Sequence, residues 1–123
     1  PKAVLSGFSA NSNATDMVVP NAESSADLMR KALRMANLEP KDIGYINTHG
    51  TATPVGDPVE MESIRLVFDE TAKPVINSTK SMTGHMIGAA GAVEPPTSTN
   101  PEMNSHGRIS SAKHAKTSIS NTR

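Results

Sequence analysis

The sequence predicts an α/β layered fold, and two observations carry that prediction. Short apolar runs that are typical of buried strands alternate along the chain with longer segments of helical periodicity. Two histidines, His49 and His85, each stand in a glycine-rich segment between a strand-like run and a helix-like run. In an α/β sheet, functional residues usually lie at that junction.

The first expected elements are a strand, a loop and a helix. Residues 3–10 predict a strand, which Gly7 weakens because it has no side chain to pack. A polar loop follows. Ser24 or Ser25 is expected to cap a helix that continues to about Asn37, since its apolar residues recur at helical spacing.

A second strand and helix are expected around the first histidine. Residues 43–47 predict a short buried strand that ends just before His49. Asp57 and Pro58 have the residue types of an N-cap and a first helical position. The helix that they open is expected to continue to about Phe68.

The second histidine follows a third expected strand, and the composition changes soon after it. Residues 74–78 predict the strand, and His85 is expected to open a helix whose small residues permit close packing. From residue 95 the chain is rich in Pro, Ser, Thr and Asn. We therefore expect residues 1–94 to form the domain, and residues 95–123 to form a polar tail that is irregular or disordered. A basic tail that binds an acidic partner is the alternative interpretation of these residues.

Composition excludes several classes of function. The 123 residues suffice for one domain. The 12 basic and 12 acidic side chains cancel, which argues against nucleic acid or an anionic membrane as a partner. No apolar run approaches the roughly 20 residues of a membrane span, and no secretory signal pattern is present. The absence of cysteine excludes a disulfide framework, so a cytoplasmic protein is expected.

The paired histidines have a chemical interpretation and a structural one. Two neutral imidazoles at neighbouring strand ends are suited to donate hydrogen bonds to one developing oxyanion. His85, at the expected start of a helix, is biased toward the neutral form by the helix dipole. The structural alternative is that each is a core histidine whose nitrogens are satisfied by backbone groups. No metal-ligand spacing joins the histidines, including His106 and His114 in the tail.

Two sequence blocks carry a family resemblance. The first is His49-Gly50-Thr51-Ala52-Thr53-Pro54-Val55-Gly56-Asp57, and the second runs from Lys80 to Gly91. Both resemble blocks in the C-terminal half of the β-ketoacyl-acyl-carrier-protein synthases, which are condensing enzymes of the thiolase-like superfamily. The resemblance implies a thiolase-like layered fold, of which only the C-terminal half is present. The family's nucleophilic cysteine lies in the other half, and this chain has none.

The resemblance also implies roles for individual residues. His49 and His85 correspond to the catalytic histidines that stabilise the enolate in a decarboxylative Claisen condensation. Lys80 corresponds to a lysine in a buried polar network behind the histidine, with Asp57 and Glu94 as its acidic partners.

Two threonines complete the site that the resemblance implies. Thr51 and Thr53 correspond to hydroxyls that bind the phosphopantetheine arm of the substrate; ordinary turn threonines are the alternative. The implied partners are acyl carrier protein and a second subunit of a homodimer, with no dissociable cofactor. Two other functions stay open: a non-catalytic truncated fragment or module of the same fold, and a related polyketide ketosynthase or chain-length-setting partner.

Overall fold

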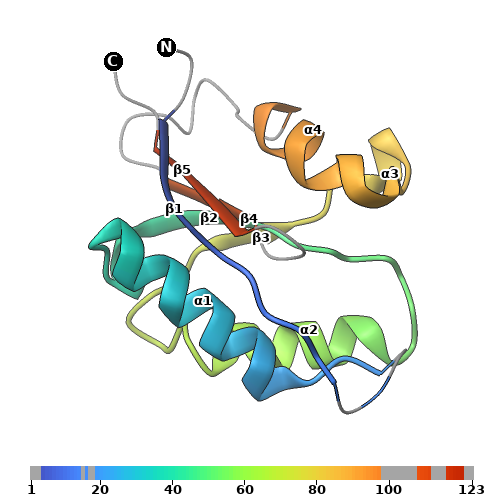
Figure 1. Cartoon of the computed structure of the whole chain (residues 1–123), viewed down its shortest axis with the longest axis horizontal. Coiled ribbons are helices and arrows are strands. Elements are labelled where there is room, and N and C mark those ends of the chain that lie inside the picture. The colour runs from blue at the N-terminus through green and yellow to red at the C-terminus, as the bar shows by residue number, and fades with distance from the viewer. Residues whose placement is uncertain (1–3, 15, 17–18, 98–107, 112–115, 121–123) are drawn as a thin grey trace.

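A five-stranded mixed sheet separates two layers of helix in the part of the chain that the structure describes (Figure 1). This computed structural model describes residues 4–14, 16, 19–97, 108–111 and 116–120. The longest helix and the one that follows it cover one face of the sheet, and the helical segments around residues 80–97 lie over the other. The predicted α/β layered fold is thus confirmed.

The elements have the following bounds. The strands are β1 (Val4–Ser9), β2 (Ile43–Asn47), β3 (Val75–Asn77), β4 (Arg108–Ser111) and β5 (Lys116–Ser120). The α-helices are α1 (Ala22–Ala36), α2 (Gly56–Arg65), α3 (Lys80–Thr83) and α4 (Ala90–Thr97), and the 3-10 helices are η1 (Pro40–Asp42) and η2 (Ile87–Ala89).

The sheet brings the ends of β2 and β3 together. Its strand order is β1-β5-β4-β2-β3, with β2 parallel to both β3 and β4 and β5 antiparallel to its two neighbours. Asn47, the last residue of β2, is directly opposite Asn77, the last residue of β3. Because parallel strands end at the same edge of a sheet, the segments that follow them, which hold the two histidines, leave the sheet side by side.

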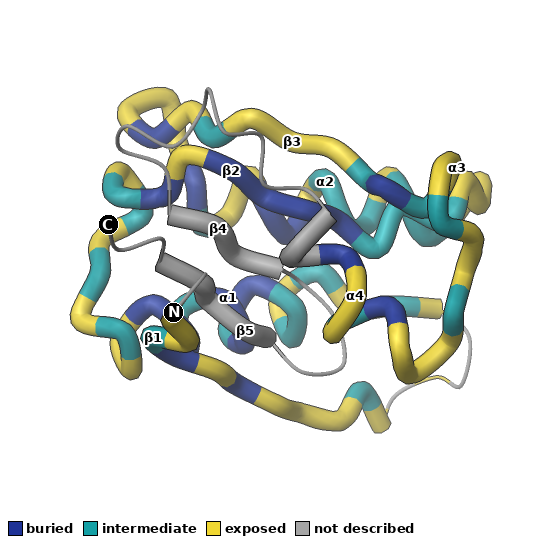
Figure 2. Tube along the Cα trace, turned by 90° about the horizontal axis from the view of Figure 1, so that it is seen from above, coloured by how far each residue is buried: buried dark blue, intermediate teal, exposed yellow. Residues whose placement is uncertain are grey.

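The hydrophobic core lies between β2 and the layer of α1 and α2. β2 is an almost continuously buried strand (Figure 2), as its apolar sequence predicts. The buried core cluster consists of Met29, Leu33, Ile43, Ile46, Ile64, Phe68 and Ala72. It is built without large aromatic groups other than one phenylalanine, which agrees with the low aromatic content of the chain.

Helix α1 starts earlier than the sequence suggests. Asn21, not Ser24 or Ser25, is the N-cap, and its Oδ1 accepts a hydrogen bond of 2.9 Å from the backbone N–H of Ser24. Asparagine and serine are nearly equivalent caps, so local propensity could not choose between these positions. The helix ends at Asn37, whose left-handed backbone (φ 54°) suits an asparagine C-cap.

Helix α2 also differs from the expectation. It spans Gly56–Arg65, with Asp57 inside its first turn and no side-chain cap from that residue. The hydroxyl of Thr53 instead accepts a hydrogen bond of 3.1 Å from the N–H of Gly56. The expected cap was therefore wrong, because a threonine four residues upstream of Asp57 satisfies the first turn.

The segment around His85 is more broken than predicted. His85 does not open an α-helix. The short helix α3 ends at Thr83, Gly84 with a φ of 75° is its C-cap, and η2 intervenes before α4 begins at Ala90. The argument that a helix N-terminus keeps His85 neutral therefore does not hold. The positive φ of Gly84 lets the chain leave α3 in an extended conformation that an L side chain rarely adopts.

The expectation that residues 95–123 are irregular was wrong for the parts of this range that the structure describes. α4 continues to Thr97, and β4 and β5 join the sheet between β1 and β2. Their sequences hold few apolar residues, so they give no local strand signal; backbone pairing with β1 and β2 places them. Residues 98–107, with His106, and residues 112–115, with His114, lie outside the described residues. The division at residue 94 stays a prediction.

Among the described residues, no helix has the length and apolar content that a membrane crossing requires.

Candidate functional site at the carboxyl ends of strands β2 and β3

His49 is two residues beyond β2, on a loop that folds back along α2. The carboxylate of Glu60, on α2, holds this loop by its backbone: Oε1 accepts from the N–H of His49 at 2.8 Å, and Oε2 accepts from the N–H of Gly50 at 2.9 Å. Hydrogen bonds to an ionised carboxylate are among the stronger ones in proteins. The position of the His49 backbone is thus fixed by a helix, although His49 itself is on a loop.

Gly50 lets the same loop pass very close to the segment that follows β3. Its φ is 45°, and a Cβ built on it would lie 2.5 Å from the Cβ of Ser78. The Ser78 hydroxyl donates to the carbonyl oxygens of His49 and Gly50 at 3.4 and 3.3 Å. The glycine beside His49 is therefore required by both its backbone conformation and the lack of space.

His85 is exposed, and the local backbone orients its ring. Nδ1 accepts a hydrogen bond of 3.1 Å from the N–H of Ile87. A nitrogen that accepts cannot carry the proton, so this bond assigns the proton of the neutral ring to Nε2. Ile87 has a φ of 50°, which is unusual for a β-branched residue, and it is 85% exposed.

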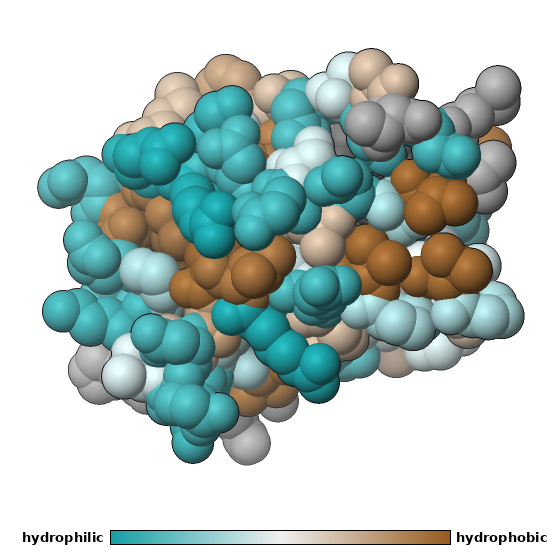
Figure 3. Space-filling model, turned by 90° about the horizontal axis from the view of Figure 1, so that it is seen from below, coloured by the Kyte–Doolittle hydropathy of each residue, from teal (hydrophilic) through white to brown (hydrophobic). Residues whose placement is uncertain are grey.

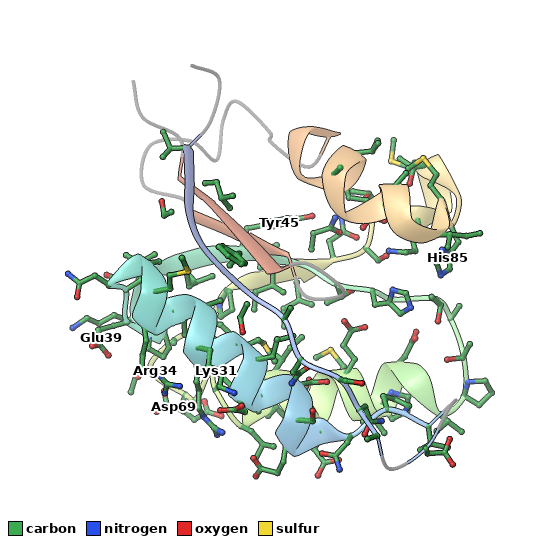
Figure 4. All side chains as sticks on the ribbon, in the orientation of Figure 1. Lys31, Arg34, Glu39, Tyr45, Asp69 and His85 are labelled. Carbon is green, nitrogen blue, oxygen red and sulfur yellow. The ribbon has the colours of Figure 1, made fainter. Side chains whose placement is uncertain are left out.

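The two rings meet. The centroids of His49 and His85 are 5.1 Å apart, and the ring planes are nearly perpendicular, at 88°. Figure 4 shows His85 under the α3 segment, on the side of the loop that follows β2. Residues that are 36 positions apart in the sequence thus form one site, as the parallel β2–β3 pair predicts.

Lys80 and Glu94 form a buried ion pair beside this site. Nζ of Lys80 is 2.7 Å from Oε1 of Glu94, and the side chains are only 7% and 4% exposed. Asp57 was also expected in this network, but among the described residues it takes part in no ion pair, and it is only half-buried in the first turn of α2. Of the two acids that the resemblance implies for this network, Glu94 is the one that the structure pairs with Lys80.

The two candidate substrate-binding threonines, Thr51 and Thr53, lie on the loop that contains His49. Their hydroxyls are 3.5 Å apart, and Thr53 is exposed while Thr51 is half-buried. Because Thr53 Oγ1 accepts from the N–H of Gly56, its own proton is available to Thr51 or to a ligand.

Sequence reasoning missed Glu60. One signal could have pointed to Glu60. Backbone N–H groups in a glycine-rich loop have no strand or helix partners, so an acid on the next helix is a candidate acceptor for them. Glu60 is the acid one turn after Asp57, on the same helix. Spacing alone did not reveal which of the two acids turns toward the loop.

Two carboxyl groups with a lowered pKa, those of Asp27 and Asp69, lie away from the histidines. A hydrogen bond from Lys31 lowers the pKa of Asp27, and hydrogen bonds from the hydroxyl and N–H of Thr71 lower the pKa of Asp69. Lys31 and Asp69 are labelled in Figure 4, on the far side from His85. These are surface contacts of α1 and of the turn after α2. Among the described residues, no cluster of three or more histidines and acids is arranged to hold a metal ion.

The fold matches that of solved ketosynthases. The chain superposes on a beta-ketoacyl synthase from Burkholderia phymatum with a TM-score of 0.83, over 99% of this chain and 38% of the other. The TM-score is 0.81, over 99% of this chain and 39% of the other, for a structure described as a type II PKS acyl-carrier protein in complex with its ketosynthase bound to the hexaketide. Both are 24% identical in sequence to this chain, so they establish the fold alone: the chain has the mixed α/β fold of part of these ketosynthase structures.

The sequence comparison gives the family. Residues 2–99 match the family described as Beta-ketoacyl synthase, C-terminal domain, and the chain belongs to that family. It is 45% identical over 95 residues to 3-oxoacyl-[acyl-carrier-protein] synthase 2 of Coxiella burnetii, covering 75% of this chain and 23% of that protein. The protein of the same name from Staphylococcus aureus is 49% identical over 76 residues, which are 61% of this chain and 19% of the relative. The chain therefore spans about a fifth of the length of these relatives.

Proposed function

We propose that this chain supplies the enolate-stabilising part of a 3-oxoacyl-[acyl-carrier-protein] synthase, an acyltransferase of fatty acid or polyketide biosynthesis. The observation that carries the proposal is the His49–His85 pair, with ring centroids 5.1 Å apart and Nδ1 of His85 occupied by the N–H of Ile87. That bond leaves Nε2–H of His85 as a donor without requiring a charged ring. Two such donors are suited to one oxyanion.

The reaction needs this stabilisation at one step. When a malonyl thioester loses carbon dioxide, the electron pair of the broken C–C bond moves into an enolate, whose oxygen becomes negative. His49 and His85 would donate hydrogen bonds to that oxygen. The enolate carbon then attacks an acyl thioester, forms the new C–C bond and releases the thiolate that carried the acyl group.

Other residues of the site have supporting roles in this proposal. The hydroxyls of Thr51 and Thr53 would bind the amides of the phosphopantetheine arm, which belongs to the acyl carrier protein and is a substrate carrier rather than a cofactor of this chain. The Lys80–Glu94 pair would hold α3 and α4 together behind His85. Acyl carrier protein is the proposed partner, in a homodimeric enzyme.

The acyl group must be carried elsewhere, because this chain has no cysteine. A thiolate is needed for the acyl-enzyme and for its ping-pong step. We expect the chain by itself to form no β-ketoacyl product from acyl- and malonyl-carrier protein. Turnover by the purified chain would show that the reaction does not need a cysteine thiolate from outside this chain.

The test is reconstitution. The portion of the Staphylococcus aureus relative that precedes its match to this chain is produced as a separate polypeptide and mixed with the 123-residue chain. Association is measured by ultracentrifugation, and carbon dioxide release and condensation are measured with malonyl- and acyl-carrier protein. Activity that needs both pieces supports the proposal. A stable complex without decarboxylation would contradict it and favour a non-catalytic fragment of the same fold.

A further inference from the structure

The segments of the two histidines separate immediately after the sheet. The last backbone bond between them runs from the N–H of Thr48 to the carbonyl of Asn77, at 2.7 Å. Beyond it, one segment turns toward α2 and the other toward α3. Backbone pairing therefore does not by itself set the distance between the rings of His49 and His85.

A buried side chain continues the connection past the strand ends. Asn47 is fully buried, with 0% of its surface exposed, and its amide reaches Thr79. Oδ1 of Asn47 accepts from the backbone N–H of Thr79 at 3.2 Å, and Nδ2 donates to the Thr79 hydroxyl at 3.4 Å. Thr79 is also buried, with 7% of its surface exposed.

The orientation of this amide is fixed by its partners. The N–H of Thr79 can only donate, so it must face the Asn47 oxygen, and the NH₂ group is then left for the hydroxyl. A flipped amide would place two donors against each other in a buried site, which is costly. Asn47 and Thr79 therefore form a two-bond link with one stable arrangement.

Each end of this link is close to a histidine along the chain. Asn47 is two residues before His49. Thr79 is the N-cap residue of α3, and its carbonyl accepts from the N–H groups of Met82 and Thr83. Its hydroxyl makes no capping bond to α3, because it faces Asn47 instead. Thr79 thus sets where α3 begins, and α3 ends immediately before Gly84 and His85.

We propose that Asn47 is a positioning residue that, through Thr79, holds the segments of His49 and His85 at the separation the oxyanion site requires. The expected effect of this link on the reaction rate rests on the proposed function. Its expected effect on the distance between the two histidine rings does not. The Ser78 hydroxyl also joins the two segments, through contacts of similar length to the carbonyls of His49 and Gly50, but Ser78 is only half-buried. The Thr48 hydroxyl donates to the carbonyl of Asn77 at 3.1 Å, next to the last backbone bond, whereas the Asn47–Thr79 link joins buried residues farther along the second segment.

Four variants distinguish the loss of the Asn47–Thr79 hydrogen bonds from a general loss of stability. Asn47→Leu removes both bonds at similar volume, and Thr79→Val removes the hydroxyl but keeps the backbone N–H. Thr79→Ser retains the hydroxyl and is the conservative control. Leu33→Ala, in the core between α1 and the sheet, is the control for destabilisation far from the link.

The first readout is the nuclear Overhauser effect between the ring protons of His49 and His85 in the full chain. We expect it to be lost in Asn47→Leu, weakened in Thr79→Val, and retained in Thr79→Ser and Leu33→Ala. The proposal would be overturned if Asn47→Leu and Thr79→Val both kept the full nuclear Overhauser effect between the rings. It would also be overturned if Leu33→Ala lost as much of this effect as they do. If Asn47→Leu does not fold, Thr79→Val against Thr79→Ser decides.

The second readout is malonyl decarboxylation in the reconstituted enzyme. Misplacement of a catalytic group by about 1 Å costs up to roughly 10²-fold in rate, so kcat is expected to fall by one to two orders of magnitude while KM for malonyl-carrier protein stays near the parental value. A rise in KM alone would contradict positioning. If the parental assembly shows no turnover, the proposed function fails. The nuclear Overhauser effect between the two rings still tests whether Asn47 and Thr79 set their separation.

Discussion

The ammonium of Lys80 and the carboxylate of Glu94 are 2.7 Å apart and almost completely shielded from water. They join the first residue of α3 to the middle of α4, on either side of His85. An isolated charge at either position would be strongly destabilising, because burial removes the water that would otherwise solvate it. The pair therefore makes the α3–α4 segment dependent on both residues.

Lys80→Ala is expected to lower the free energy of unfolding by roughly 3–5 kcal/mol, since it removes the cation of a buried ion pair and leaves the Glu94 carboxylate buried without that charge. The measurement is urea unfolding of the variant against the parent. Lys31→Ala is the matched control: its ion pair with Asp27 has side chains 50% and 47% exposed, so its loss should cost under about 1 kcal/mol. A Lys80→Ala change within about 0.5 kcal/mol would show that the pair is solvated.

His49→Ala and His85→Ala should each slow malonyl decarboxylation in the reconstituted enzyme by about 10²–10³-fold, the usual effect of losing one oxyanion donor. Carrier-protein binding should survive, because Thr51 and Thr53 make the proposed contacts to the arm. Binding is measured by fluorescence anisotropy and decarboxylation by carbon dioxide release. A variant that decarboxylates at the parental rate would assign that histidine to the scaffold.

Glu60→Gln should loosen the loop of His49. An amide has only one accepting oxygen, so one of the two backbone N–H groups that Glu60 holds would lose its partner. We expect faster hydrogen exchange at His49 or Gly50, read by NMR. Glu62→Gln, at an exposed position of the same helix, should leave both exchange rates unchanged. Equal exchange in all three proteins would mean that the carboxylate does not hold this loop.

Gly7→Ala should destabilise the packing of α1 on β1. A Cβ at this position would lie 2.7 Å from the carbonyl oxygen of Ala32 and 2.9 Å from the backbone N of Ala36, so the helix must move away. Such overpacking typically costs about 1–3 kcal/mol. Gly88→Ala is the control, because no atom lies within 4 Å of the position that its new methyl group would occupy. Thermal unfolding of the two variants should differ; equal midpoints would contradict the close approach.

The chain by itself is expected to self-associate. Large apolar side chains are exposed on several elements, among them Leu5 and Phe8 of β1 and Met82 and Ile87 beside the candidate site. Figure 3 shows further apolar patches, interrupted by polar residues, on the face of α1 and α2. Exposed apolar patches of this kind favour association. Sedimentation and thermal unfolding at several concentrations should both depend on concentration; a monomer with a concentration-independent transition would exclude it.

The sequence by itself determined the alternation of strands and α-helices as far as β3, and the position of both histidines beyond strand ends. The buried run Ile43–Asn47 and the helical periodicity between Ser24 and about Asn37 are local signals, and the structure has a strand and a helix there, with the helix starting at Ala22. A family resemblance, not a local signal, placed Lys80 in a buried network with Asp57 and Glu94 as candidate partners, and the structure pairs it with Glu94. Local propensity could not choose the caps, since Asn21 competes with nearby serines and Thr53 with Asp57.

Only the tertiary structure decided which groups meet. Glu60, rather than Asp57, turns toward the loop of His49, and the amide of Asn47 finds Thr79 across the ends of two parallel strands. β4 and β5 have sequences without a strand signal and are placed by pairing with strands distant in the chain. The physical reason is common to these cases: a hydrogen-bond partner is chosen by direction and distance in space, which residue type and spacing along the chain do not specify.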